Sequence, residues 1–414
     1  MEEEYRTTTD DFLKEELKII QEQLMNRFKT NYACLTHFLY SNDNEFPIED
    51  SFMDVKLQKT DFLRRKTGEI IQIKDIFPKE TIQHRTVLIT GDPGCGKTTI
   101  CRKIAYDWGK NEESGDYLRQ FDVVVLIESR ELVKRDLSDA VYEYMNKDFH
   151  YRNTLIETTW NFLVILDGFE EVCYKESLKD FISVDLFFIS PKMTVVVTSH
   201  LPIADEISIH FDDQYCIEGL SLEQKVNYID FMIKEDKDKK DYLINFLEND
   251  AFKLTKCPLM LQMLCFLPDS SVYGDIKTKT DMFIFIFYLM IKRYKREKGQ
   301  SQRLKKGTFF DGEDLIMKLG NLCYTKLFQR RSNDDVSGTR QITEEDFRIT
   351  FSDDEEYQCI VGLDIFKKCS GENSEQYFEF IHKSFMEFAV AVYIFHSMDT
   401  VTIPYVHEKI YFIP

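Results

Sequence analysis

The sequence has none of the cysteine spacings that mark a zinc ribbon or a redox motif. Its ten cysteines include no C-x-x-C pair, and several lie inside apolar runs, where a thiol behaves as a small hydrophobic side chain. The N-terminus lacks the basic and then apolar order of a secretory signal, and it is too acidic for an organelle transit peptide. These absences favour a cytoplasmic protein with reduced thiols.

Long apolar runs and excess positive charge are also missing. The most apolar stretch, residues 282–291, is about half of the roughly 20 residues that a membrane span requires, so we expect a buried helix and no membrane span there. Lys and Arg number 53 against 72 Asp and Glu, which leaves a net charge of −19. A surface of that sign repels phosphodiester backbones, so we expect no nucleic acid partner.

Apolar residues, by contrast, make up 43% of the 414 residues and can fill two or three domain cores. Near the N-terminus they recur at steps of three and four, which predicts one face of an amphipathic helix. The residues on that face are Leu13, Leu17, Ile20, Leu24 and Phe28. We expect the helix to pack on the same chain, with an oligomer interface as the alternative. Residues 41–85 predict short strands and loops that lead into the next domain.

Five short apolar runs follow, separated by segments long enough for crossover helices. Runs that are apolar throughout, rather than alternating, are typical of strands covered on both faces. They lie at residues 86–91, 122–129, 162–168, 194–200 and 215–219. The pattern predicts an α/β fold with a parallel five-stranded sheet and helices on both of its sides.

The first run ends in a glycine-rich loop with the spacing G-x-x-x-x-G-K-T. After a strand and before a helix, such a loop lets backbone N–H groups and the helix N-terminus converge on phosphate oxygens. Lys97 would reach the β and γ phosphates, and the Thr98 hydroxyl would ligate Mg²⁺. The sequence therefore predicts a P-loop NTPase. Its predicted phosphate-binding residues are Gly91, Asp92, Pro93, Gly94, Cys95, Gly96, Lys97, Thr98 and Thr99.

Acidic residues follow the third apolar run. Asp167 is the expected partner of Mg²⁺, and Glu170 and Glu171 are placed to orient an attacking water, with Glu171 as the first choice. Three acids at a strand end could also form a solvated edge. The wholly apolar strand before them and the phosphate loop upstream favour the catalytic interpretation.

Three further candidates have plain structural alternatives. Thr198 and His200 end the fourth apolar run, where ligands collect in open α/β sheets, and could contact the γ-phosphate or form an ordinary turn. Pro258 heads an apolar helix, where its ring suits the first turn and could also lie against a nucleotide base. His382 lies among aromatic residues, where a lone histidine is more often a satisfied core residue than a ligand.

The chain after Gly219 predicts mainly helices. Ser221 and Gln224 have the spacing of a capping box at the start of the first one. Residues 362–385 predict a strand, a turn around Gly371 and a second strand that enters a helix. No leucine-rich or ankyrin period is present.

In this order, the motifs resemble the NACHT family of signal-transducing P-loop ATPases, which belongs to the STAND class, and in particular the central module of animal NOD-like receptors. The stretch "GDPGCGKTTICRKIAYDWG" is similar to the family's phosphate loop and helix, and "FLVILDGFEEV" is similar to its Walker B strand. "TSHLP" resembles its sensor strand and "KCPLMLQMLCFL" its Pro-containing helix. "YFEFIHKSFMEFAVAVYIF" resembles the end of its winged-helix domain.

The resemblance implies a molecular switch that binds ATP or ADP with Mg²⁺. Pro258 would pack against adenine, and His382 would hold the phosphate of bound ADP and so lock the winged-helix domain over the nucleotide. The sensor strand would lie between the Walker A and Walker B strands. ADP would mark a closed monomer, and exchange for ATP would expose an oligomerisation surface in innate immune or cell-death signalling.

The resemblance also implies a domain order. Residues 1–84 would hold the N-terminal helix and a flanking segment, 85–219 the nucleotide-binding domain, 220–280 a helical domain, 281–396 the winged-helix domain, and 397–414 the start of a further region. One departure concerns the sensor, because His200 and Leu201 precede Pro202 where the family usually has Arg directly before Pro.

The ends of the chain also differ from the family pattern. The residues before Pro47 are few for an effector domain, and no sensing repeats follow the winged helix. We therefore expect a regulatory fragment, a truncated product, or a minimal switch that borrows its sensor from a partner protein.

Three functions remain open at this stage. The first is the nucleotide switch, with slow ATP hydrolysis if any and with itself and unidentified sensor or effector proteins as partners. The second is a turnover P-loop NTPase that acts on a protein partner. The third is a scaffold that binds no nucleotide, which Lys97, Thr98 and Asp167 argue against.

Overall fold

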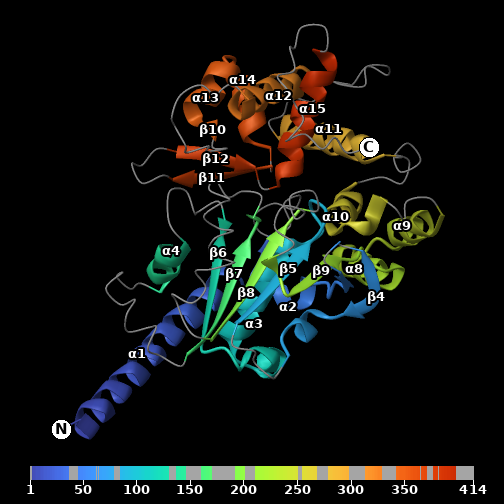
Figure 1. Ribbon diagram of the computed structural model, residues 1–414. Coiled ribbons are helices and arrows are strands. Elements are labelled where there is room, and N and C mark those ends of the chain that lie inside the picture. Colours follow the sequence, from blue (N-terminus) through green and yellow to red (C-terminus); the bar gives the residue numbers. More distant parts are fainter. Residues whose placement is uncertain are drawn as a thin grey trace. The chain divides into compact units, whose positions relative to one another are not determined.

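The chain forms two compact units (Figure 1). The first contains residues 1–36, 44–232 and 255–259, and the second contains residues 37–43, 233–254 and 260–414. The computed structural model describes residues 2–36, 45–61, 63, 65–78, 84–129, 137–145, 160–169, 192–200, 210–249, 254–267, 278–297, 313–328, 342–363, 365–370, 376–380 and 382–397.

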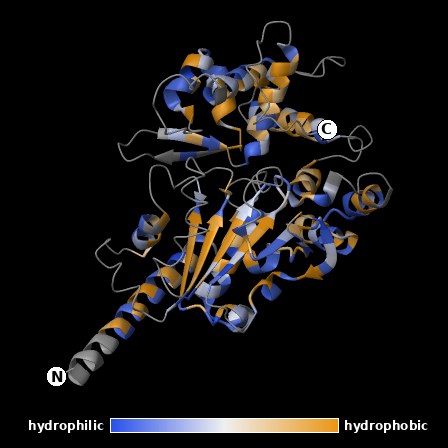
Figure 2. Cartoon of the chain, in the orientation of Figure 1, coloured by the Kyte–Doolittle hydropathy of each residue, from blue (hydrophilic) through white to orange (hydrophobic). Residues whose placement is uncertain are grey.

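A seven-stranded sheet forms the core of the first unit, with the strand order β4-β3-β9-β5-β8-β7-β6. Five of its strands are parallel: β5 (His84–Thr90), β6 (Val123–Glu128), β7 (Asn161–Asp167), β8 (Lys192–Ser199) and β9 (Asp213–Ile217). Strands β5, β6, β7 and β8 are buried along most of their length, and β6 and β7 are mostly orange in Figure 2. The predicted five-stranded parallel sheet is confirmed, as is the place of β8 between β5 and β7.

The sheet is wider than the apolar runs predict. Strands β3 (Leu57–Thr60) and β4 (Lys66–Ile71) extend it, because β3 pairs antiparallel with β9 on one side and with β4 on the other. Strand β4 is exposed at almost every residue, as suits an edge. Part of the segment expected only to lead into the next domain is therefore built into its sheet.

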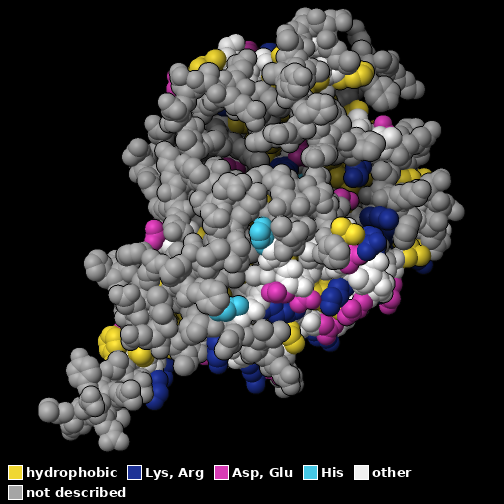
Figure 3. Space-filling view, in the orientation of Figure 1, with side chains coloured by type: hydrophobic (Ala, Val, Ile, Leu, Met, Phe, Trp, Pro, Cys, Tyr) yellow, Lys and Arg dark blue, Asp and Glu magenta, His cyan; other side chains and the backbone are white. Residues whose placement is uncertain are grey.

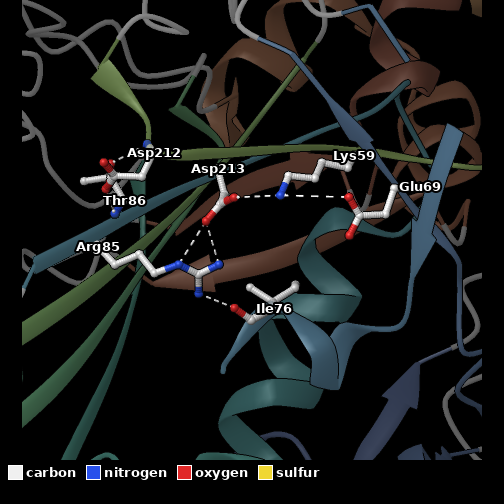
Figure 4. A network of polar contacts seen from close by, with 7 residues as sticks. All are labelled: Lys59, Glu69, Ile76, Arg85, Thr86, Asp212 and Asp213. Atoms are coloured by element: carbon white, nitrogen blue, oxygen red, sulfur yellow. Dashed lines mark hydrogen bonds and ion pairs between the residues drawn. The ribbon is translucent and has the colours of Figure 1, made fainter. Parts of the chain in front are cut away.

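A buried arginine ties these added strands to the parallel sheet (Figure 4). The Arg85 guanidinium donates to the Asp213 carboxylate from Nε and Nη2, at 3.0 and 2.8 Å, and from Nη1 to the Ile76 carbonyl. The other carboxylate oxygen of Asp213 lies 3.4 Å from Nζ of Lys59, which also reaches Glu69 on β4. One network thus joins four strands near the start of β5.

Helices pack on the parallel strands. Helix α3 (Lys97–Lys110) follows β5 and packs on β6, β7 and β8, and α1 (Glu2–Asn31) packs on α3. Phe28 of α1 is fully buried, 6.0 Å from the ring of Trp108 in α3. The apolar face predicted for this helix therefore packs on the same chain in its second half, while Phe12 near the other end is exposed. Helix α4 (Leu137–Tyr144) packs on β6.

Smaller elements complete the first unit. They are the antiparallel pair β1 (Cys34–Thr36) and β2 (Glu45–Pro47), the short helix α2 (Ile48–Ser51), and the 3₁₀ helices Ile73–Ile76 and Glu113–Leu118. On the face shown in Figure 3, Lys and Arg side chains interleave with Asp and Glu over part of this unit. Ion pairs in this unit include Lys66 with Glu218 and Lys110 with Glu49.

Helix α8 (Leu222–Met232) begins directly after the sheet. Ser221 N donates to Gln224 Oε1 at 2.9 Å and Gln224 N donates to Ser221 Oγ at 3.3 Å, which confirms the predicted capping box. The 3₁₀ turn Leu254–Lys256 then leads into α10 (Pro258–Phe266), which begins in the first unit and continues into the second. Pro258 is the first residue of that helix, as the sequence predicts.

The second unit combines helices with a small antiparallel sheet. Its helices are α9 (Lys237–Asn249), α11 (Lys279–Glu297), α12 (Glu313–Phe328), α13 (Glu344–Thr350), α14 (Asp354–Val361) and α15 (Lys383–His396). Its strands pair in the order β10 (Ile342–Thr343), β12 (Gln376–Phe380) and β11 (Phe366–Ser370). The predicted strand pair that enters a helix is thus β11, β12 and α15, while Gly371 lies outside the described residues.

Aromatic rings fill the core of this unit. Phe283 and Phe287 of α11 pack on Phe385 and Phe388 of α15 with ring centroids 5.3–5.7 Å apart. The apolar run at residues 282–291 is therefore part of a core helix. Within the described parts of the chain, no helix has the length and apolar content needed to cross a bilayer. Assignment of residues 281–396 to a winged-helix domain stays a prediction.

Candidate nucleotide-binding site

The glycine-rich loop connects the carboxyl end of β5 to the first turn of α3. Because β5, β7, β8 and β9 are parallel, their carboxyl ends meet at this edge of the sheet. Gly96 caps α3 with φ +102°, a conformation that only glycine adopts without strain. The first N–H groups of α3 have no acceptor within the helix, so they can donate to an anion.

The loop also touches the segment that starts α10. Gly94 has φ +75°, and a Cβ on it would lie 2.9 Å from both Cys257 Sγ and Leu259 Cβ. Leu259 N donates to the Gly94 carbonyl at 3.4 Å, and Cys257 Sγ donates to the Pro93 carbonyl at 3.5 Å. Pro258 lies between these two contacts in the chain, so the structure brings it next to the phosphate loop.

The Lys97 ammonium is buried at the base of this loop and has three acceptors around it. Its Nζ donates to the carbonyl oxygens of Gly91 and Asp92 at 2.8 and 3.2 Å, and lies 3.2 Å from Nδ1 of His200. The structure thus brings two predicted site residues, one at the start of α3 and one just after β8, into contact.

Asp167 lies at the end of β7, close to the start of α3. Thr198 Oγ1 donates to Asp167 Oδ1 at 2.7 Å and accepts from Gly168 N at 2.9 Å. Burial raises the pKa of the Asp167 carboxyl above its usual range, and hydrogen bonds from Thr98 and Thr198 oppose that shift. Thr98, Asp167 and Thr198 therefore form one cluster contributed by α3, β7 and β8, in which Asp167 and Thr198 are buried and Thr98 is exposed.

This cluster suits a magnesium ion bound together with phosphates. Mg²⁺ prefers oxygen ligands, keeps several waters, and is commonly held by one or two protein groups plus substrate phosphates. The Thr98 hydroxyl and the Asp167 carboxylate supply such a pair beside the loop. In the part of the chain that the structure describes, no group of three or more His, Cys, Asp or Glu could hold a metal by itself.

The cysteines of the site are unsuited to nucleophilic chemistry. Burial raises the pKa of Cys95 in the loop to about 12, so its thiol is neutral at pH 7. Burial also raises the pKa of Cys101, one turn into α3, well above its usual value. All cysteines whose state the structure gives are free thiols, in line with the sequence analysis.

For three predicted site residues, a place at the loop stays a prediction. Glu170 and Glu171 lie outside the described residues, so their water-orienting role stays a prediction. His382 belongs to the second unit, where it caps α15 by accepting a hydrogen bond from Ser384 N at 3.2 Å. That cap gives His382 a structural role, and its contact with nucleotide stays a prediction.

Sequence reasoning identified Pro258 but missed its neighbours. Cys257 and Leu259 make the contacts with the loop, and Lys225 of α8 donates to Thr255 just before them. The only signal for Lys225 is a lysine in the first turn of a helix with an evident cap, where a cation is disfavoured. No pattern in the sequence marks the other residues.

Comparison with known proteins finds a family model that matches the stretch of chain containing this site. Residues 85–236 match the family model described as the NACHT domain. The protein "NLR family CARD domain-containing protein 4" of Xenopus tropicalis is 23% identical over 361 residues, which is 83% of this chain and 32% of that protein. Human "NACHT, LRR and PYD domains-containing protein 12" is 20% identical over 337 residues, 75% of this chain and 30% of that protein.

Two further similarities complete the comparison. The mouse protein "NACHT, LRR and PYD domains-containing protein 10" is 22% identical over 205 residues, 47% of this chain and 30% of its own length. A solved STAND ATPase with a tetratricopeptide repeat sensor, from Pyrococcus horikoshii, is 12% identical with a TM-score of 0.37 and covers 77% of this chain and 44% of its own. The chain spans about a third of the length of the curated relatives it matches.

Proposed function

The chain belongs to the NACHT family of P-loop NTPases, of the NOD-like receptor type, and from that premise we propose that it is an ATP- and ADP-binding molecular switch. The observation that carries the proposal is the convergence of Lys97, Thr98 and Asp167 at one edge of the sheet, beside a loop whose N–H groups can bind phosphate. The nucleotide-binding domain would comprise residues 85–219, the helical domain 220–280 and the winged-helix domain 281–396.

Different residues would bind different parts of the nucleotide. The loop from Gly91 to Thr99 would bind the phosphates, and Thr98 and Asp167 would hold Mg²⁺, which offsets charge on the phosphate oxygens when bound. Glu170 and Glu171 would orient a water for slow hydrolysis. Pro258, held next to Gly94 by its neighbours, would pack against the base.

His200 would report which nucleotide is bound. A γ-phosphate that reaches Lys97 competes with the Nδ1 atom that now accepts from it, so ATP would release the imidazole and ADP would leave the Lys97 contact in place. Thr198 would stay fixed, because it already bonds both Asp167 and the Gly168 N–H. Such a difference between nucleotide states is the minimum that a population shift requires.

We further propose that ADP marks a closed monomer, in which His382 holds the phosphate, and that exchange for ATP leads to self-association. The setting would be the cytoplasm and the pathway innate immune or cell-death signalling, with sensor or effector proteins as partners. Support for these finer statements comes from the resemblance of the motifs, from the relatives, and from the family match.

Nucleotide release tests the proposal directly. Purified chain is denatured and the released nucleotide is identified by chromatography, in parallel with a steady-state assay of phosphate release. Retained ADP with slow turnover supports the switch. Rapid turnover would instead support an NTPase that acts on a partner, and a preparation without nucleotide that also fails to bind any would support a scaffold.

A further inference from the structure

Lys225 stands where its charge is disfavoured. It lies in the first turn of α8, where its N–H donates to the Ser221 carbonyl at 3.0 Å, and its side chain is fully buried. Helix N-termini repel cations, and burial strips water from an ammonium. Burial, and then the nearby Lys256, lower the pKa of Lys225 to about 8. An apolar side chain of similar volume would fill this space without those penalties, so packing alone does not account for a lysine.

The Lys225 ammonium is directed at the turn before α10. Its Nζ donates to Thr255 Oγ1 at 2.9 Å, and Thr255 is itself fully buried. Two residues that precede α8 also contact this turn. Leu220 N donates to the Lys256 carbonyl at 3.0 Å, and a Cβ on Gly219 would lie 2.7 Å from Lys256 Cβ. The turn is therefore fixed relative to the end of the sheet.

From this turn the chain passes directly to the phosphate loop. Cys257 contacts the Pro93 carbonyl and Leu259 contacts the Gly94 carbonyl, with Pro258 between them. All of these residues, and Lys225 with them, belong to the first unit. One continuous set of contacts thus runs from the Lys225 ammonium through Thr255 to the loop.

We propose that Lys225 and Thr255 are positioning residues that set how closely Pro258 is held to the phosphate loop. They thereby determine how much more tightly the chain binds a nucleoside diphosphate than a polyphosphate that lacks a base. The inference rests on the proposed function, since it assumes that the loop binds phosphate and that Pro258 meets the base. Neither residue contacts the nucleotide. They act by fixing the position of residues 255–259.

Comparing the binding of a ligand with a base and a ligand without one distinguishes a positioning role from general support of the fold. Mg·ADP and Mg·tripolyphosphate are titrated by calorimetry into nucleotide-free full chain, for the wild type, Lys225→Met, Thr255→Val, Thr255→Ser and Lys234→Met. Thr255→Val keeps the shape of the side chain and removes its hydroxyl, whereas Thr255→Ser keeps the hydroxyl. Lys234→Met removes an exposed lysine just beyond α8 as the matched control.

Lys225→Met and Thr255→Val are each expected to weaken ADP binding by about tenfold, the size of one hydrogen bond to a charged group, while tripolyphosphate binding stays within about twofold. Thr255→Ser and Lys234→Met should match the wild type. The double variant Lys225→Met with Thr255→Val should be no weaker than the worse single variant, because both remove the same bond.

Equal weakening of the two ligands, or unchanged ADP affinity in both variants, would overturn the inference while leaving the proposed function intact. Failure of the wild type to bind either ligand would instead overturn the proposed function, and this inference with it. Should Lys225→Met not fold, the ratio of ADP to tripolyphosphate affinity in Thr255→Val against Thr255→Ser decides.

Discussion

At the scale of single residues, the Lys97 ammonium is held by three neighbouring groups. Two loop carbonyls and Nδ1 of His200 accept from its ammonium, so it is held in place rather than free to rotate. A phosphate that binds here replaces one acceptor by a charged one and needs little rearrangement. Preorganisation of this kind raises affinity because less side-chain entropy is lost on binding.

Lys97→Ala should therefore abolish nucleotide binding, with a loss of at least about 100-fold, because it removes both the charge and the group that orients the loop. Lys110→Ala is the matched control, since Lys110 ends the same helix and pairs with Glu49 and Glu112 on the surface. Fluorescent ADP titration measures both. Near wild-type affinity in Lys97→Ala would contradict the assignment of the loop.

Lys225 also predicts a pH dependence of stability. Its pKa is about 8 in the folded chain against a usual 10.5, so between these values the unfolded chain holds a proton that the folded chain has released. Stability rises with pH wherever the unfolded state binds more protons. The unfolding free energy of the wild type should thus rise relative to that of Lys225→Met from pH 8 to 10.5, measured by urea denaturation.

Lys256→Met provides the check on that prediction. Removal of the Lys256 charge takes away the second cause of the low pKa, so the rise should be smaller and begin at higher pH. A constant difference between wild type and Lys225→Met over the whole range would show that Lys225 titrates normally in the folded chain.

At the scale of elements, the added strands β3 and β4 depend on the Arg85 network. Arg85→Met should destabilise the chain by about 2–3 kcal/mol, because it leaves the Asp213 carboxylate without its main donor in a largely buried place. Lys59→Met should change stability by less than about 1 kcal/mol, since its pairs are more exposed. Urea denaturation of the two variants, side by side, tests the ranking. Equal effects would contradict it.

Helix α1 should contribute to stability through its second half only. Phe28 is fully buried against Trp108, Tyr32 and Tyr144, so Phe28→Ala should cost about 3–5 kcal/mol. Phe12 is 55% exposed, and Phe12→Ala should stay within about 0.5 kcal/mol. Thermal unfolding followed by circular dichroism compares them. A large effect at Phe12 would indicate a partner for that end of the helix.

At this scale, the sequence predicts the elements that are marked by a local pattern and misses those that depend on partners far along the chain. The five parallel strands are evident because each contains a run that is nearly all apolar rather than alternating, and the loop after β5 is evident from glycine spacing. Strands β3 and β4 are short and polar, and β3 pairs with β9, which lies far along the chain. Their register depends on long-range partners such as Arg85 and Asp213, which no local pattern reveals.

The residues of the site also fall into two groups. Lys97, Thr98 and Asp167 belong to local motifs, and the structure places Thr98 and Lys97 close to Asp167. The contact of His200 with Lys97 and the grip of Lys225 on Thr255 join segments that are distant in sequence. Only the folded sheet and the turn before α10 bring them side by side.

At the scale of the whole molecule, the proposed switch depends on communication between the two units. His382→Ala should loosen ADP retention and increase oligomer formation, because it would remove the proposed contact of the second unit with the phosphate. Nucleotide extraction and light scattering measure the two effects. His382→Asn serves as a control for the helix cap, since Asn also caps helices well. Unchanged retention and unchanged size in His382→Ala would remove His382 from the switch.

The central claim is that this chain binds one nucleotide in the loop after β5 with Mg²⁺ held by Thr98 and Asp167. Calorimetric titration of ATP and ADP, with magnesium, into the nucleotide-free chain measures it most directly. The account predicts saturable binding of one nucleotide per chain that weakens strongly when magnesium is removed and is lost in Lys97→Ala. No measurable binding of adenine or guanine nucleotides to the folded wild-type chain in the presence of magnesium would contradict it.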